Sequence, residues 1–293
     1  MNQNPTPRLS IALPVYNGER YLAATIEGLL AQSYTDFELI LADNASTDAT
    51  ESICRAFAAR DRRVRYDRAE RNLGAAWNFN RSFDMARGEY FKWAAHDDLH
   101  HPLFLQRCIE VLDARPEVVL CFTRTEFIDG EGRHLREYPF PVDVNNASRR
   151  QLFTVYATAG HIMHEIFGVI RRQALVGSPL IGSYVGSDVV LVGMLSLKGR
   201  FHQVQELLFQ HREHEGRSTR TAGGSLGYTR WFDSRVKVRV VMPYWRRVWE
   251  NTRSVMKAQL PAGAKLGHLV DVARTANWNR RQLASELLQL VRP

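Results

Sequence analysis

The chain has 293 residues, enough to bury a large core as one domain with an appendage or as two small domains. Its composition is that of a soluble protein, and no uninterrupted apolar run approaches membrane-spanning length. The formal net charge of +8 indicates an anionic partner, namely nucleic acid, a phosphate-bearing ligand or a membrane surface. Nucleic acid is disfavoured, because the chain has no zinc-finger pattern and no aromatic RNA-binding strand.

The start of the chain and its cysteines bear on the compartment. Residues 1–8 are polar, contain two prolines and lack the apolar core of a signal peptide, so we expect a disordered arm. Cys54, Cys108 and Cys121 are odd in number and scattered through apolar stretches, which favours reduced, buried thiols. We therefore expect a cytoplasmic protein, with a peripheral position on the inner face of the membrane as an open alternative.

From residue 9 to residue 122, short apolar runs alternate with segments in which apolar residues recur at helical spacing. The expected strands are 9–15, 37–42, 64–66, 90–95 and 118–122, and the expected helices are 19–31, 47–59, 75–86 and 102–115. Ser46 or Thr47 is a suitable N-cap for the second helix. This alternation predicts an α/β fold with a mostly parallel, Rossmann-like sheet and helices on both faces.

The stretch YFKWAAHDDLHHP, residues 90–102, is the strongest indication of a site. Its apolar strand leads directly into Asp97 and Asp98, at the carboxyl edge of the sheet, where open α/β folds bind ligands. Neighbouring carboxylates repel each other, so a divalent cation or strong hydrogen-bond donors must compensate them. An isolated acidic pair is more often a solvated turn, and here the surrounding chain favours a site.

Other turns after expected strands carry groups suited to a nucleotide. Asp43 could hydrogen-bond a base or ribose, and Asn72 with Gly74 permits close approach of the backbone to a phosphate. The chain has neither GxGxxG nor GxxxxGK[ST], which argues against the dinucleotide and P-loop versions of such folds.

After residue 122 the pattern weakens into loops until about residue 159. The elements expected beyond that point are strands at 166–171, 201–204 and 207–210 and a helix at 184–198. Asp188 lies near the start of that helix, where a helix cap and a catalytic acid are about equally supported. Arg212 and His214 follow the last strand, and the simplest interpretation of their segment is a charged loop.

Residues 217–227 are rich in Gly, Ser and Thr, which predicts a linker. Beyond it, four tryptophans stand among many arginines with helical periodicity: Trp231, Trp245, Trp249 and Trp278. Such helices most often dock on their own domain or on a partner subunit, as in a homodimer, although they also lie on anionic membranes. The expected division is an arm at 1–8, a main domain at 9–220 with halves 9–122 and 123–220, and a linker with C-terminal helices at 221–293.

Five segments together resemble family 2 of the inverting nucleotide-sugar glycosyltransferases, which have the GT-A fold. They are ALPVYNGERYL; QSYTDFELILADNASTDAT; RNLGAAWNFNRSFDMARGEYFKWAAHDD; FGVIRR; and GSDVVLVGMLSLKGRFHQVQELLFQHREH. Each segment alone is weak evidence, but all five occur in the family's order and cover about residues 9–218. The tail after about residue 227 lies outside the resemblance.

The resemblance implies roles for the matching residues. Those expected to contact the nucleotide are Pro14, Tyr16, Glu19, Asp43, Asp97 and Arg212, with Asp43 on the uracil or ribose, and Asn72 joins them on the strength of its turn. Those expected to hold Mn²⁺ or Mg²⁺ are Asp97 and Asp98, with His214 also within reach. Arg212 and His214 would close over the diphosphate, and Asp188 would be the catalytic base.

Two residues depart from the family pattern. Ala95 stands where many relatives begin an Asp-x-Asp motif, and Asn44 stands where many have a second Asp. Either change could weaken ribose or metal contact, so metal dependence follows less directly from the sequence than the fold does.

The expected function is inverting transfer of a sugar from a nucleotide-sugar donor, UDP-linked, to a hydroxyl of a glycan or lipid-linked acceptor in cell-surface polysaccharide synthesis. Such transfer needs a base for the hydroxyl proton and positive charge for the leaving diphosphate. A nucleotidyltransferase would instead place a Gly-rich basic loop after the first strand, where this chain has YNGER. A non-catalytic nucleotide-sugar binder or assembly scaffold is the remaining alternative. Ala95 favours it slightly, and retention of the other site residues opposes it.

Overall fold

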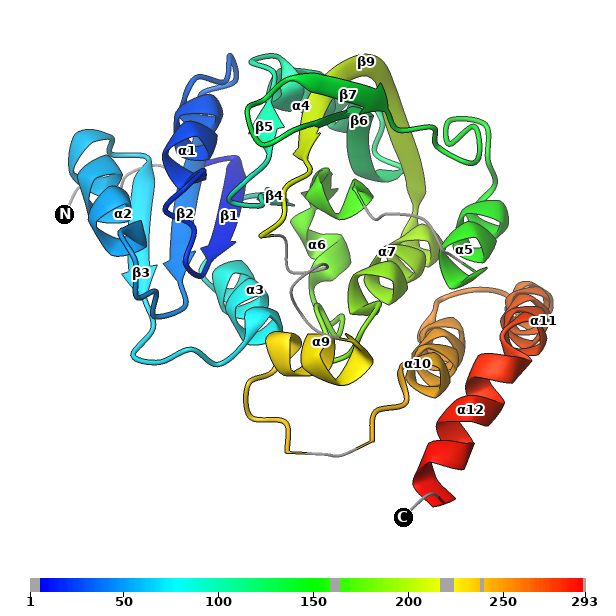
Figure 1. The fold of residues 1–293 in the computed structure, drawn as a ribbon. Helices are drawn as coiled ribbons and strands as arrows, with labels where there is room; N and C mark the ends of the chain where they lie inside the picture. The colour runs from blue at the N-terminus through cyan, green and yellow to red at the C-terminus, as the bar shows by residue number, and fades with distance from the viewer. Residues whose placement is uncertain (1–5, 159–163, 217–223, 238–239, 292–293) are drawn as a thin grey trace.

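Nine strands form one curved sheet in the computed structural model, which describes residues 6–158, 164–216, 224–237 and 240–291 (Figure 1). The strand order is β3-β2-β1-β4-β8-β6-β9-β5, and β7 pairs with β6. The strands are β1 (Leu9–Val15), β2 (Phe37–Asp43), β3 (Val64–Arg68), β4 (Tyr90–Trp93), β5 (Leu99–His100), β6 (Val118–Ile128), β7 (His134–Glu137), β8 (Val169–Arg171) and β9 (Arg200–Arg212). Four of the strand pairings among the described residues are parallel and four are antiparallel, so the sheet is mixed rather than mostly parallel.

Helices cover both faces of the sheet, as predicted. They are α1 (Leu22–Leu30), α2 (Thr50–Arg60), α3 (Ala75–Asp84), α4 (Phe104–Ala114), α5 (Arg149–Thr158), the 3₁₀ helix η1 (Glu165–Phe167), α6 (Arg172–Leu175) and α7 (Ser187–Lys198). Strand β1 shows how the two faces are built: Leu9, Ile11 and Leu13 enter a core with α1, α2 and α4, whereas Ala12 enters a second core with α3, α5 and α7. A strand covered on both faces is apolar throughout. The three cysteines are free and buried, as predicted.

Several elements differ from the sequence prediction: β6 continues to Ile128, and β7 and α5 lie in the stretch expected as loops. Strand β9 is one strand of 13 residues, where we expected two short strands followed by a loop. Its register against β6 shifts on both sides of Arg124, which interrupts the alternation of apolar residues and explains the expected break. Helix α2 begins after Ala49 without a side-chain cap, because Ser46 instead accepts a hydrogen bond from the backbone N–H of Asn17.

The C-terminal region consists of α9 (Gly224–Phe232), α10 (Pro243–Lys257), α11 (Ala262–Trp278) and α12 (Arg280–Val291). Residues 224–227, expected in the linker, belong to α9, and residues 217–223 lie outside the described residues. Helix α10 packs on α7 and α11 packs on α5 (Figure 1). A third apolar core joins them through Phe153, Leu197, Val255 and Val272. The structure therefore supports docking of the tail on its own domain.

The described part of the expected N-terminal arm is held in place. Arg8 donates hydrogen bonds to both oxygens of Asp113, at 3.0 and 2.7 Å, and to Glu89 at 3.3 Å. Residues 1–5 lie outside the described residues. No helix in the described part of the chain is both long and apolar enough to cross a bilayer.

Lys92 is a fully buried lysine in β4, and it makes stability depend on pH. Its ammonium donates to the carbonyl of Phe167 and lies 4.6 Å from the ring centre of Phe104. Burial lowers the pKa of Lys92 from its ordinary value of 10.5 to about 7. Between these values the unfolded chain binds more protons than the folded protein, so stability falls as the pH is lowered from 10.5 towards 7.

We expect Lys92→Met to raise the melting temperature, and to raise it more at about pH 7 than at about pH 9.5, because the variant has no lysine to discharge on folding. Circular dichroism melts at both pH values measure this difference. Lys257→Met, which changes an exposed lysine at the end of α10, is the matched control. An equal gain at both pH values for Lys92→Met would contradict the assignment.

Candidate active site

The turns after β1 and β2 are fastened to each other. The backbone N–H of Gly18 donates to Oγ1 of Thr50 at 2.8 Å, and Oε2 of Glu19 accepts from the N–H of Ala49 at 2.9 Å. Pro14 lies buried in β1, whereas the Tyr16 side chain is 43% exposed beside these turns. Of the residues expected to contact the base and ribose, Tyr16 is therefore exposed at the surface. Glu19 is already hydrogen-bonded to the turn after β2.

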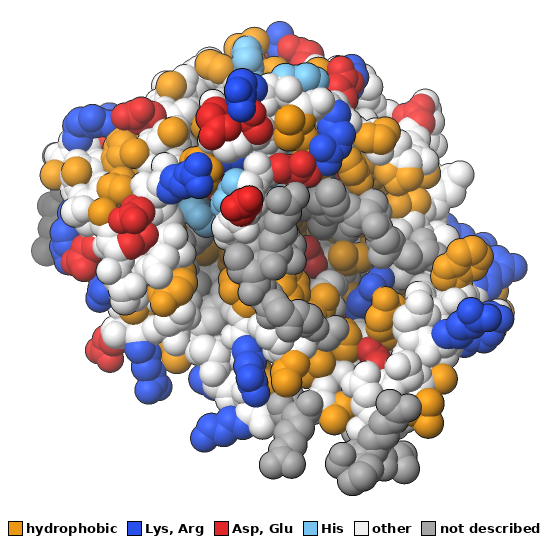
Figure 2. Space-filling model, viewed as in Figure 1, with side chains coloured by type: hydrophobic (Ala, Val, Ile, Leu, Met, Phe, Trp, Pro, Cys, Tyr) orange, Lys and Arg blue, Asp and Glu red, His pale blue; other side chains and the backbone are white. Residues whose placement is uncertain are grey.

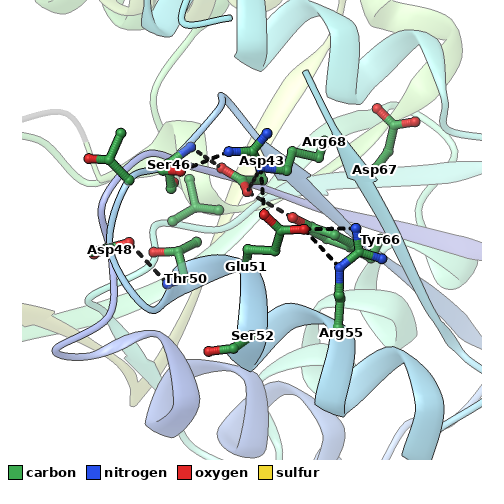
Figure 3. A network of polar contacts seen from close by, with 12 residues as sticks. Asp43, Ser46, Asp48, Thr50, Glu51, Ser52, Arg55, Tyr66, Asp67 and Arg68 are labelled. Carbon is green, nitrogen blue, oxygen red and sulfur yellow. Dashed lines mark hydrogen bonds and ion pairs between the residues drawn. The ribbon is translucent and has the colours of Figure 1, made fainter. Parts of the chain in front are cut away.

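Asp43, at the end of β2, is fully enclosed in a polar network (Figure 3). Its Oδ1 accepts from the N–H of Ser46 at 2.8 Å, and its Oδ2 accepts from the hydroxyl of Tyr66 at 2.8 Å. Arg68 lies 3.4 Å from the same carboxylate and also pairs with Glu51. Asp43 thus shapes the turn after β2, and a nucleotide could reach it only if these side chains moved.

Asn44 connects this turn to the loop before α3. Its amide nitrogen donates to Oδ1 of Asn72 at 2.9 Å and to the carbonyl of Gly74 at 3.2 Å, while its oxygen accepts from the N–H of Leu73. A carboxylate at position 44 could accept but could not donate. The departure from the family's second Asp therefore has a structural reason, and the Asn72 side chain is used within the same network.

The acidic pair follows β4, in a loop that α1 fixes. Oγ1 of Thr25 donates to the carbonyls of His96 at 2.9 Å and of Asp98 at 3.0 Å. The two carboxylates then turn in different directions. Asp98 points inward with no exposed surface, and its Oδ1 lies 3.0 Å from the N–H of Arg212 and 3.0 Å from Nδ1 of His211. Asp97 lies nearer the surface, where Oδ2 is 2.9 Å from Nε2 of His214.

Arg212 is the last residue of β9 rather than part of a charged loop, and it holds two loops together. Its Nε donates to the carbonyl of Asp97 at 2.8 Å, and Nη1 donates to the carbonyls of Asp129 and Gly130 at 3.1 and 3.0 Å. Its guanidinium carbon also lies 4.7 Å from the ring centre of Tyr21. Arg212 was expected to close over the diphosphate, but these bonds direct its buried donors into the protein.

His214 is the basic side chain that lies beside Asp97, and a tenth of its side-chain surface is exposed. Its ring packs 4.8 Å from that of Tyr21, centre to centre. Burial alone would raise the pKa of Asp97, but the charge of His96 and the hydrogen bond from His214 outweigh it and hold that pKa well below its usual range. The Asp97 carboxylate is therefore ionised, as a metal ligand must be. Acidic, basic and histidine side chains gather in the upper half of the face shown in Figure 2.

These residues fit a metal ion in part. Within the described residues, no three His, Cys, Asp or Glu side chains converge as a ready-made metal site. Asp98, expected as a ligand, is enclosed by Arg212 and His211, which leaves Asp97 and His214. One carboxylate and one imidazole suit Mn²⁺, and ions that act on nucleotides complete their coordination with phosphate oxygens and water. The fit is therefore to a metal that arrives with a diphosphate.

Asp188 lies in the first turn of α7, apart from the acidic pair. The helix cap is Gly186, at φ +83° without a side-chain cap, so Asp188 is not the N-cap. Burial raises the pKa of Asp188, and the backbone N–H groups of Val189 and of Asp188 itself act in the opposite direction. A carboxylate whose pKa is raised in this way is suited to taking up a proton.

Titratable side chains that the sequence did not indicate connect the acidic pair after β4 with Asp188. The ring of His211, bonded to Asp98, lies 4.5 Å from that of His164, centre to centre. The next residue, Glu165, is buried, and burial followed by the negative charge of Asp188 raises the pKa of Glu165 to about 8. The sequence does contain one indication of these groups, because the polar residues His164 and Glu165 directly precede the apolar segment that leads into β8.

Comparisons with known proteins identify the fold and the family. The profile described as "Glycosyl transferase family 2" matches residues 10–176. An "uncharacterized glycosyltransferase" of Rickettsia typhi is 34% identical over 125 residues, which is 41% of this chain and 38% of that relative. The matched stretches span 13% to 46% of the curated relatives compared, so the chain aligns with less than half of each.

Two solved structures share the fold at low identity. S. aureus TarS (residues 1–349), solved in complex with UDP-GlcNAc, has a TM-score of 0.70 at 16% identity and covers 96% of this chain and 79% of its own. The mannosyltransferase PcManGT of Pyrobaculum calidifontis, solved with GDP-Man and Mn²⁺, has a TM-score of 0.53 at 16% identity and covers 97% of this chain and 87% of its own. At identities this low, the two structures show that the chain has a GT-A-type fold.

Proposed function

Because the chain belongs to glycosyl transferase family 2, we propose that it is an inverting enzyme that moves a sugar from a UDP-linked donor to a hydroxyl of a glycan or lipid-linked acceptor, in cell-surface polysaccharide synthesis. The family match over residues 10–176 carries the proposal. The complexes of TarS with UDP-GlcNAc and of PcManGT with GDP-Man support a nucleotide-sugar donor.

The donor would lie along the turns after β1, β2 and β4. We assign the base and ribose to the surface around Tyr16, with Pro14, Glu19, Asp43 and Asn72 shaping it from behind. Asp97 and His214 would hold Mn²⁺ or Mg²⁺ against the diphosphate. When bound, such an ion would neutralise the negative charge that grows on the leaving group. Arg212 and Asp98 would hold in place the loop that carries Asp97.

The reaction needs one proton acceptor. The acceptor hydroxyl attacks the anomeric carbon while its proton passes to a carboxylate oxygen of Asp188, and the bond from that carbon to the diphosphate breaks. A single displacement of this kind inverts the anomeric configuration. The partly buried position of Asp188 suits it to this role, because a carboxylate whose pKa is raised binds a proton more readily than a fully exposed one.

A non-catalytic nucleotide-sugar binder with the same fold is the alternative that an observation favours. Ala95 lacks a carboxylate, and Asp98 is used internally, so fewer side chains remain for a metal than in a full Asp-x-Asp site. Such a protein would bind donor without releasing nucleoside diphosphate.

A thermal-shift screen of nucleotide sugars, each with and without Mn²⁺, tests the proposal. A true donor stabilises the folded state by mass action, by about 2.7 kcal/mol at a hundredfold excess over its Kd. We expect UDP-sugars to raise the melting temperature, and more so with Mn²⁺. The stabilising sugar is then assayed for release of nucleoside diphosphate. Stabilisation without release would identify the binder, and no stabilisation by any nucleotide sugar would contradict both assignments.

The outer surface of α10–α12 supports a peripheral position at a membrane. Trp249 and Trp278 are 62% and 84% exposed, and Arg253 and Arg274 are exposed as well. Basic and apolar side chains lie side by side where Figure 1 places these helices (Figure 2). Aromatic and basic helices of this kind bind anionic lipid surfaces. We propose a cytoplasmic protein that binds the inner membrane face here.

We expect the protein to sediment with vesicles containing phosphatidylserine, less so as salt rises, because surface charge is screened within about 8 Å at physiological ionic strength. Replacing both Trp249 and Trp278 with Ala should abolish sedimentation without changing donor binding. Neutral vesicles are the control. Unchanged sedimentation of the double variant would contradict this surface. A change in oligomer mass instead would mark it as a homodimer interface.

A further inference from the structure

Helix α10 brings a positive charge to the start of α7. Arg247 of α10 lies against Gly186, the cap residue of α7, so closely that a methyl group built on Gly186 would be 3.0 Å from Cδ of Arg247 and 3.5 Å from its Nε. Gly186 therefore serves twice: it adopts the left-handed turn at φ +83° and leaves room for this side chain. Asp188 follows two residues later.

The charges around Asp188 oppose one another. Glu165 of η1 and Tyr184, which precedes α7, both interact electrostatically with Asp188, and an ionised form of either would repel its carboxylate. Arg247 is the cation identified as acting on Asp188 among the described residues. Burial raises the pKa of Asp188, whereas the backbone N–H groups of Val189 and Asp188 and then the charge of Arg247 lower it.

The neighbouring arginine on α10 has a different partner. Arg246 pairs with Glu250 at 2.7 Å and lies 5.5 Å from the ring centre of Tyr184. Arg246 therefore interacts along its own helix, whereas Arg247 lies against the start of α7. The position of Arg247 is a specific product of how α10 packs on α7.

We infer that Arg247 is a positioning residue for Asp188: from α10, outside the stretch that the family profile matches, its guanidinium favours the ionised form of the carboxylate at the start of α7, which takes the proton of the acceptor hydroxyl. The inference rests on the proposed role of Asp188 as the base. It gives the C-terminal helices a part in the reaction, in addition to completing the core.

The inference predicts a specific change in the pH dependence of turnover. Removing the cation makes Asp188 bind a proton more readily, so the acidic limb of the kcat profile moves to higher pH. We expect Arg247→Met, which keeps an apolar stem against Gly186, to lose about threefold to tenfold more kcat at pH 6 than at pH 8. Arg247→Lys should restore the position of the limb. KM for the donor should stay unchanged in both variants.

Lys257→Met is the matched control, since it removes an exposed positive charge from the end of the same helix. Melting temperatures of all three variants are measured alongside. The inference would be overturned if the acidic limb of the kcat profile did not move in Arg247→Met. It would also be overturned if Arg247→Met and Arg247→Lys lost kcat equally at all pH values, which would show a packing role. A wild-type protein that turns over no nucleotide sugar would instead overturn the proposed function.

Discussion

Asp188→Asn should lower turnover by about 10² to 10⁴-fold, because an amide cannot take up the proton of the acceptor hydroxyl. Donor affinity should stay nearly unchanged, since the base acts on the acceptor. The melting temperature should also change little, because the amide oxygen can still accept from the N–H groups of Asp188 and Val189. Steady-state kinetics, donor titration and a thermal melt of the same variant test all three statements.

Asp84→Asn provides a control, because Asp84 is an exposed acid at the end of α3. If Asp188 served only the helix, its variant would lose about 1 kcal/mol or less of stability and keep its activity. That pattern would contradict the assignment of the base, and would leave the family and the fold untouched.

Asp97→Ala should abolish transfer while the protein stays folded, because it removes the ionised carboxylate that we propose faces the diphosphate and opens no core cavity. Excess EDTA should have the same effect on the wild-type protein. Full activity of Asp97→Ala, or activity that EDTA does not change, would rule out the metal role. Asp84→Asn again controls for loss of a surface charge.

Asp98→Ala should differ from its neighbour by being unstable. The sequence alone predicts that either substitution leaves the protein folded, since each relieves the repulsion between the two acids. In the structure, removing Asp98 leaves the N–H of Arg212 and the ring of His211 without their buried acceptor. An unsatisfied buried group costs about 1–3 kcal/mol, so the melting temperature of Asp98→Ala should fall below that of Asp97→Ala.

The contrast between Asp97 and Asp98 shows what the sequence could and could not predict. The apolar run from Tyr90 and the turn after it were sufficient to place both acids at the edge of the sheet. Their different directions depend on the end of β9, more than 110 residues later. This end supplies His211 and Arg212 to Asp98, and His214, just beyond it, contacts Asp97. The pattern of residues around Asp97 and Asp98 does not show which of the two acids a strand so distant in the sequence will contact.

The first half of the fold was predictable for a related reason. Up to residue 122, each strand is followed by a polar turn and a helix with apolar residues at helical spacing, so local rules suffice. Strand β9 was not predictable as one strand, because its register shifts against β6 interrupt the alternation of apolar residues in the sequence. The same limit applies to Arg247, whose approach to Gly186 depends on the packing of α10 on α7.

The anomeric configuration of the first product tests the account most directly. The donor identified by thermal shift is incubated with enzyme and Mn²⁺, and proton NMR follows the sugar formed in the earliest turnovers, before it equilibrates in solution. With Asp188 as a base and no covalent intermediate, the account predicts an anomer inverted relative to the donor. A product that retains the donor configuration would contradict it.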